Sequence, residues 1–227
     1  DCTPSRGLGD VYKRQDPATP AVEVTQYGDG DVEQWYTQTW LQEEIPVLDI
    51  LWVIDNSGSM NRFQTNLSLN IGSFMGAFIA TGADYNMAVI TTDDPNFTTI
   101  VRPTSPDPES QLASLVMMGI YGSGIEKGIE MVSNSLSDPA AAGPGGLFFR
   151  ESSKLVVIFV SDEPDQSAAG WSSYISFFDG LKSPGDFIPY GVIGDHPSGC
   201  SISSPFGNAQ YGACLLYTSP SPRDGVQ

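Results

Sequence analysis

The chain contains an uninterrupted apolar run, Ile50-Leu51-Trp52-Val53-Ile54, followed at once by the polar turn Asp55-Asn56-Ser57-Gly58-Ser59-Met60. A continuous apolar run bounded by turn residues is typical of a strand buried on both faces of a parallel sheet. A second run of this kind, Lys154 to Val160, ends in Ser161-Asp162-Glu163. The two junctions therefore predict two buried parallel strands with polar groups at their carboxyl ends.

The pattern around these runs indicates an α/β domain. From Val47 onward, candidate strands alternate with helical apolar stripes, which favours a parallel sheet with crossover helices. We expect a Rossmann-like, doubly wound, mostly parallel sheet with helices on both faces, truncated at its C-terminal end. Further strands are predicted at 84–92, 98–102 and 187–193, the second of them short and more exposed. Helices are predicted at 62–80, near 109–116, after Ser123 with Ile125, Ile129, Val132 and Leu136 on its buried face, and around 171–181.

The turn after the first run has the side chains of a cation site. Asp55, Ser57 and Ser59 alternate along one short loop, and Gly58 lets that loop fold tightly. Converging carboxylate and hydroxyl oxygens suit a small hard cation, so we expect Mg²⁺, with Mn²⁺ or Ca²⁺ as alternatives. The same residues are also common turn formers, and an ordinary self-capped turn is the competing interpretation.

The pattern Asp-x-Ser-x-Ser after an apolar strand resembles the metal-ion-dependent adhesion site of von Willebrand factor A (vWA) domains. The resemblance covers roughly residues 47–195 and includes two later loops. Ser123 in Gly122-Ser123-Gly124 takes the place of the family's usual Thr, and Asp162 matches the Asp that follows a later strand. The resemblance implies a metal site of Asp55, Ser57, Ser59, Ser123 and Asp162, the last often acting through water. A plain helix cap is the alternative for Ser123.

The resemblance also implies a function. With Asp55 as the one carboxylate bound directly, a divalent ion keeps about one uncompensated positive charge, which an Asp or Glu side chain of a protein partner can satisfy. We therefore expect an adhesion-type, cation-dependent protein-binding domain and not an enzyme. The chain has one histidine, His196, and no evident general base beside the metal loops. A structural vWA domain with a vestigial site is the main alternative; a metal-assisted hydrolase using Asp55 as nucleophile is less favoured, because no second acid follows it closely.

Other acidic residues surround the predicted site. Asp165 is a candidate for a second cation site, although a solvated acidic loop is the commoner arrangement. Asp93 and Asp94 follow the predicted strand 84–92, and we expect them to line the rim of the site.

Both ends of the chain look foreign to the domain. Ser5 to Gln15 and Cys214 to Asp224 can be encoded by opposite strands of one DNA segment, which resembles a sequencing-library adapter. We expect residues 1–15 to be adapter-like and disordered, and residues 16–46 to form a linker or an edge segment. The domain itself is predicted at 47–195, followed by an irregular tail at 196–213 and adapter-like sequence at 214–227.

Composition restricts the partners. The chain has 27 acidic and 10 basic residues and a net charge of −17. The two adapter-like ends hold three acidic and four basic residues, so the rest carries a net charge of −18. Such a surface repels nucleic acid and anionic membranes, and no apolar stretch is long enough to span a bilayer. Similar bacterial A-domain proteins imply a cell-envelope or extracellular location, with a lipoprotein as one form of it. For Cys200 the alternatives are a reduced thiol and half of a disulfide whose partner has been lost, and the same resemblance favours the disulfide.

Overall fold

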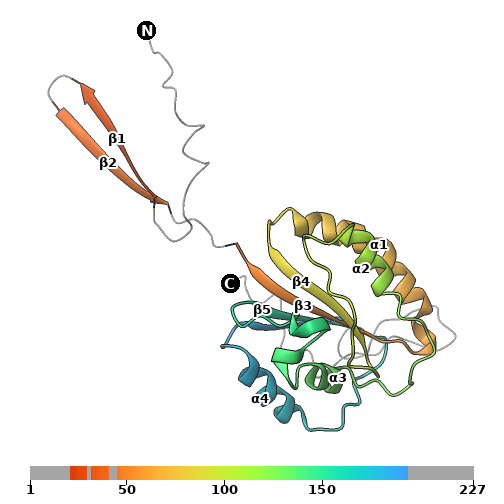
Figure 1. Ribbon diagram of the computed structural model, residues 1–227. Coiled ribbons are helices and arrows are strands. Elements are labelled where there is room, and N and C mark those ends of the chain that lie inside the picture. Colours follow the sequence, from red (N-terminus) through yellow and green to blue (C-terminus); the bar gives the residue numbers. More distant parts are fainter. Residues whose placement is uncertain (1–20, 30–31, 41–44, 194–227) are drawn as a thin grey trace. The chain divides into compact units, whose positions relative to one another are not determined.

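The computed structural model describes residues 21–29, 32–40 and 45–193 (Figure 1). The chain divides into two units between Ile45 and Pro46. In the first unit, β1 (Ala21–Asp29) and β2 (Val32–Trp40) pair antiparallel, with Ala21 opposite Trp40. The linker or edge segment expected at 16–46 contains these two paired strands, at 21–29 and 32–40. The predictions for 1–15, 196–213, 214–227, His196 and Cys200 lie outside the described residues.

The second unit is built on a sheet of four parallel strands. These are β3 (Val47–Ile54), β4 (Asp84–Thr91), β5 (Lys154–Val160) and β6 (Phe187–Val192), in the order β4-β3-β5-β6. Each neighbouring pair is parallel, and the carboxyl ends of β3 and β5 are level because Ile54 pairs with Val160. The expected parallel α/β sheet is confirmed.

The apolar runs are buried because the sheet is covered on both faces. Alternate residues of β3 enter different cores: Leu51 and Val53 contribute to one, and Ile50, Trp52 and Ile54 to the other. The helices α1 (Asn61–Ile79) and α2 (Pro108–Leu115) cover one face. The helices α3 (Gly128–Ser135) and α4 (Trp171–Leu181) cover the other (Figure 1). The Rossmann-like, doubly wound arrangement is therefore confirmed.

Short 3-10 turns complete the domain. They are η2 (Gly58–Met60), η3 (Pro139–Ala141) and η4 (Pro144–Gly146). Among the described residues, no helix is both long and apolar enough to cross a membrane.

Two local predictions are wrong. The helix expected after Ser123 begins only at Gly128, so Ile125 lies in the preceding loop with 53% of its surface exposed, whereas Ile129, Val132 and Leu136 are buried as predicted. The strand expected at 98–102 is reduced to one antiparallel bridge between Val101 and Met87. In both places the local sequence is apolar enough for a regular element, but the backbone bonds to neighbouring segments instead.

The amino-terminal edge of the sheet carries a buried ion pair. Asp49 on β3 has no exposed surface and accepts hydrogen bonds from the Arg150 side chain at 2.7 Å and the Ser153 hydroxyl at 2.5 Å. The Arg150 guanidinium also bonds Asp84 at 2.9 Å, and the Lys182 ammonium donates to the Arg150 carbonyl at 2.5 Å. The charges at this edge are thus paired.

The strand order places a crevice at the opposite edge. From β3 the chain passes to β4 on one side, and it then returns to β5 on the other. Loops that leave neighbouring strands in opposite directions open a crevice at their carboxyl ends, which is where doubly wound sheets bind ligands. The loops that begin at Asp55 and Ser161 flank this position.

Candidate metal centre

Asp55 is held rigidly at the carboxyl end of β3. Its side chain is fully buried, and its backbone N–H donates to the Val160 carbonyl at 2.9 Å. One carboxylate oxygen, Oδ1, accepts a hydrogen bond from the Ser57 backbone N–H at 2.8 Å, and Oδ2 accepts one from the Ser161 hydroxyl at 2.7 Å. Two loops therefore orient one buried carboxylate.

A chain of hydrogen-bonded oxygens joins two loops, the first loop, which begins at Asp55, and the third loop, which begins at Ser161. The hydroxyls of Ser57 and Ser59 lie 3.1 Å apart, and the Ser59 hydroxyl donates to Asp162 Oδ1 at 2.9 Å. Ser57 and Asp162 are 4% and 7% exposed, and Ser59 is partly buried. The structure thus brings four of the five predicted ligands, including Asp55, into one bonded group.

Ser123 stands apart from that group. Its hydroxyl accepts a hydrogen bond from the Ile125 backbone N–H at 3.0 Å, as in a local turn. Its own N–H donates to Asp93 at 2.8 Å, while the preceding Gly122 N–H donates to the Asn56 carbonyl at 2.9 Å. Within the described residues it shares no hydrogen bond with the other four predicted ligands. The second loop, Gly122 to Lys127, is therefore attached to the first loop by its backbone.

Asp93 connects these loops at the end of β4. It accepts hydrogen bonds from the Thr91 hydroxyl at 2.6 Å and the Asn56 side-chain amide at 3.1 Å, in addition to the Ser123 N–H. Burial alone would raise the pKa of Asp93, but these hydrogen bonds outweigh it and lower the pKa. Asp93 is thus an ionised anchor between the two loops.

Glu126 is a buried acid that the sequence reasoning did not single out. It is 1% exposed, and its Oε2 accepts a hydrogen bond from the Thr92 hydroxyl at 2.5 Å. Its Oε1 has no hydrogen-bond partner among the residues that the structure describes. Burial, reinforced by the charges of Asp55 and Glu163, raises the pKa of Glu126 to about 8.

Two further acids repel Asp55. Burial, followed by the charge of Asp55, raises the pKa of Asp162, although the bond from Ser59 opposes the shift. Burial, followed by the charges of Asp55 and Asp162, also raises the pKa of Glu163. The negative charge of Asp55 thus contributes to the raised pKa of both neighbouring carboxyl groups, as a like charge does.

Asp165 has a different role from the second cation site considered above. One of its oxygens accepts from the Ile129 N–H and the other from the Ser167 N–H, both at 3.0 Å. The Ser167 hydroxyl accepts from the Glu130 N–H at 2.9 Å. Both oxygens of Asp165 are thus engaged in holding the third loop to the first turn of α3.

Gln64 supports the first loop from behind. This α1 side chain is 1% exposed, and its amide nitrogen donates to the Asp55 carbonyl at 2.8 Å and to the Gly119 carbonyl at 2.7 Å. Its amide oxygen accepts from the Gly119 N–H at 3.1 Å. All the polar atoms of its side chain are therefore used.

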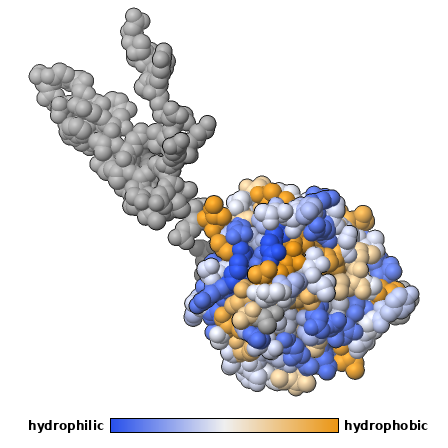
Figure 2. Space-filling model, in the orientation of Figure 1, coloured by the Kyte–Doolittle hydropathy of each residue, from blue (hydrophilic) through white to orange (hydrophobic). Residues whose placement is uncertain are grey.

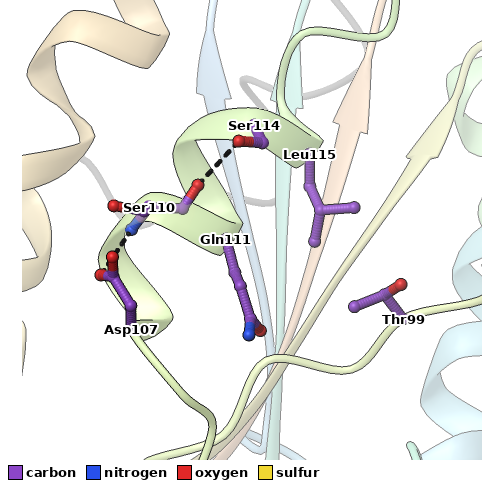
Figure 3. A pocket seen from close by; sticks show the side chains of 6 residues that line it. All are labelled: Thr99, Asp107, Ser110, Gln111, Ser114 and Leu115. Carbon is purple, nitrogen blue, oxygen red and sulfur yellow. Dashed lines mark hydrogen bonds between the residues drawn. The ribbon is translucent and has the colours of Figure 1, made fainter.

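Of two hollows on the described part of the surface, the smaller adjoins the candidate site. The smaller, about 20 Å³, lies where strand ends and loops meet, and Thr92, Glu126, Ser161 and Glu163 are among the residues that line it. The larger is an open hollow of about 420 Å³ beside α2, where Thr99 faces Gln111 and Leu115 (Figure 3). Its Asp107 already accepts from the Ser110 N–H at 3.1 Å, and it contains none of the predicted ligands.

The donor set decides which ion fits. In the described part of the chain, no three Asp, Glu, His or Cys side chains are grouped so that they could hold a metal. A cation here must therefore use hydroxyl oxygens and water beside one or two carboxylates. Such an all-oxygen set suits Mg²⁺, Mn²⁺ or Ca²⁺ and disfavours Zn²⁺, which prefers nitrogen and sulfur. The residues present fit a hard divalent cation.

Comparisons with known proteins assign no family to the chain. No family model matches it, and neither does any curated protein. Among solved structures, the proximal thread matrix protein 1 from the mussel byssus (crystal form 2) matches with a TM-score of 0.44 and 15% sequence identity. The match covers 77% of this chain and 39% of that chain. A likeness at this level carries no argument about family, ligand or activity.

Proposed function

We propose that the domain beginning at Val47 is a vWA-type domain that binds one divalent cation, Mg²⁺ first, at the carboxyl edge of its sheet. The observation that carries the proposal is the oxygen chain from Ser57 through Ser59 to Asp162, beside the buried Asp55 carboxylate. Hydroxyls that are aligned with carboxylates from two loops form a set that a hard cation can join without large rearrangement.

The chemistry of the ion suggests what it does. Mg²⁺ takes about six oxygen ligands and retains waters where the protein supplies few. Seryl hydroxyls are neutral, so the ion keeps positive charge, and an exchangeable water position can accept a carboxylate. We infer that the partner is a protein offering Asp or Glu, and that the domain binds without catalysing a reaction. On the resemblance of its motifs alone, we place it in a bacterial envelope or outside the cell.

Calorimetric titration of the full chain with Mg²⁺ and Mn²⁺ tests the cation site. Asp55→Asn should abolish binding, and Ser59→Ala should weaken it by about tenfold or more, because it interrupts the link to Asp162. The matched control is Asp94→Asn, since Asp94 is exposed and its side chain bonds only the nearby Asn96 among the described residues. Equal binding by wild type and Asp55→Asn would refute the site.

Acetate provides a simple probe of carboxylate capture. In the Mn²⁺-loaded full chain, acetate should displace a metal-bound water and reduce the enhancement of water-proton relaxation. Chloride at the same ionic strength is the control for screening. Tight Mn²⁺ binding with no response to acetate would remove the partner-binding part of the proposal.

Ser123 favours a second candidate, a structural domain with a vestigial site. Its hydroxyl is engaged with the Ile125 N–H at 3.0 Å and not with the other predicted ligands. For this candidate, the first and third loops serve only to close the edge of the sheet. The absence of any cation-linked heat in the titration above would select it.

A further inference from the structure

We propose that Glu126, through its Oε1 atom, is an additional ligand of the cation held at Asp55. This inference rests on the proposed function, because it assumes that a divalent cation binds at this edge. It adds a second carboxylate to a site for which the motif resemblance supplies one directly bound acid, and it changes how tightly the ion is held.

The first argument is the state of the Glu126 carboxyl group. The residue is 1% exposed, and the Thr92 hydroxyl occupies Oε2 at 2.5 Å, whereas Oε1 has no partner among the described residues. Buried polar atoms are nearly always satisfied, and an unsatisfied one is costly. An unpartnered buried carboxylate oxygen therefore indicates a missing donor or a missing cation.

The second argument is where this oxygen lies. Glu126 and Ser161 line the same small cavity of about 20 Å³, and the Ser161 hydroxyl bonds Asp55 Oδ2 at 2.7 Å. Glu126 is thus on the Ser161 side of the Asp55 carboxylate. No basic residue is among those that line the cavity. A cation is the species that would satisfy both acids.

The third argument is that the backbone holds Glu126 from both sides. The Gln166 N–H donates to the Glu126 carbonyl at 2.5 Å, and the Lys127 N–H donates to the Thr92 carbonyl at 3.1 Å. The third loop and the end of β4 thus fix the position of a residue on the second loop. The backbone at Glu126 is therefore held in place beside the site, and the side chain extends from a fixed position.

A second carboxylate has a measurable consequence. Oxygen sites for divalent cations bind more tightly as their carboxylate count rises. Glu126 should therefore strengthen cation binding and, by neutralising the ion, weaken its attraction for an outside carboxylate. Removing the charge should move these two affinities in opposite directions, which a merely structural residue would not do.

The experiment compares Mn²⁺ binding by the full chain as wild type, Glu126→Gln, Glu163→Gln and Asp179→Asn. Glutamine keeps an acceptor for Thr92 but loses the charge. Glu126→Gln should raise the Kd for Mn²⁺ by about tenfold or more. At saturating Mn²⁺ it should bind acetate more tightly than wild type. The exposed Asp179 on α4 provides the control, and Asp179→Asn should change the Kd for Mn²⁺ by less than about threefold. Glu163→Gln removes a neighbouring acid of the same cavity and should raise this Kd less than Glu126→Gln does.

A measurement without substitution covers the case in which Glu126→Gln fails to fold. Wild-type protein with ¹³C-labelled glutamate carboxyls, loaded with Mn²⁺, should show a hyperfine coupling from a directly bound carboxyl carbon, and the coupling should persist in Glu163→Gln. An unchanged Kd in folded Glu126→Gln, or no coupling in the labelled wild type, would overturn the inference alone. No Mn²⁺ binding by wild type would overturn the proposed function as well.

Discussion

The Asp165 carboxylate accepts a hydrogen bond from the Ile129 backbone N–H at 3.0 Å, although 36 residues separate them. Ile129 is in the first turn of α3, whose own N-cap residue, Lys127, provides no capping side chain. Ser167 accepts from the next N–H, that of Glu130, at 2.9 Å. The loop after β5 therefore caps α3, a helix that precedes β5 in the chain.

Asp165→Ala should destabilise the domain by about 0.5–2 kcal/mol, the usual cost of losing a helix cap. The substitution removes the acceptor for Ile129 and leaves the Ser167 bond to the Glu130 N–H in place. Urea unfolding measures the change, with exposed Asp179→Ala on α4 as the control. A loss no larger than that of the control would show that the cap contributes nothing.

Gly122→Ala should disturb the first loop, because an added Cβ would lie 2.2 Å from Asn56 Oδ1. Asn56 would have to move and lose its 3.1 Å bond to Asp93. We expect about 1–3 kcal/mol of destabilisation, as for other overpacked sites, measured by urea unfolding. Gly124→Ala is the matched control, because nothing lies within 4 Å of its added Cβ. Equal stabilities for the two variants would contradict the contact.

The cation-free domain should lose stability as the pH rises. Burial first, and then the charges of Asp55 and Glu163, raise the pKa of Glu126 from 4.5 to about 8. Below pH 4.5 this carboxyl is protonated in both states. Between 4.5 and about 8 the unfolded chain gives up its proton while the folded chain retains it, so the free energy of unfolding falls. The raised pKa values of Asp162 and Glu163 act in the same direction.

Urea unfolding with chelator at several pH values measures this effect. The fall should amount to a few kcal/mol, since each pKa unit corresponds to about 1.4 kcal/mol. Glu126→Gln should flatten the profile, and saturating Mg²⁺ should restore stability at high pH. A stability that rises with pH in wild type without cation would contradict the assignment.

Asp49→Ala should be severely destabilising, by about 3–5 kcal/mol, because it leaves the Arg150 guanidinium without its buried partner. Asp49 is fully buried, and its bond to the Arg150 side chain is 2.7 Å long. Asp186→Ala is the control: Asp186 is 40% exposed and lies 3.8 Å from Lys154, so its loss should cost at most about 1 kcal/mol. Chemical unfolding of both variants gives the comparison.

The sheet could be predicted well because its strands are buried on both faces. The run at Lys154–Val160 has the predicted bounds, and β3 begins at Val47 as expected. Outside these runs, composition was less informative. Polar residues between 21 and 40 suggested a linker, but antiparallel pairing of β1 with β2 does not require an apolar sequence.

The candidate site could be predicted only as far as its motif. Asp55, Ser57 and Ser59 are adjacent in sequence, and Asp162 follows a buried strand, so local pattern sufficed for them. Glu126 looked like one polar residue on a helix, because only the tertiary fold buries it against Thr92. Glu126 and the adjacent Lys127 are both charged, and the sequence alone does not show which of the two is buried.

Gln64 gives α1 an influence on two loops at once. A single side chain joins the carbonyl of Asp55 to both backbone groups of Gly119, which are 64 residues apart in the chain. Any sliding or rotation of the first turns of α1 should therefore displace the backbone at Asp55 and at Gly119 together. The domain thus has a linkage through which a displacement of the loop that begins at Asp55 would be transmitted to α1, or the reverse.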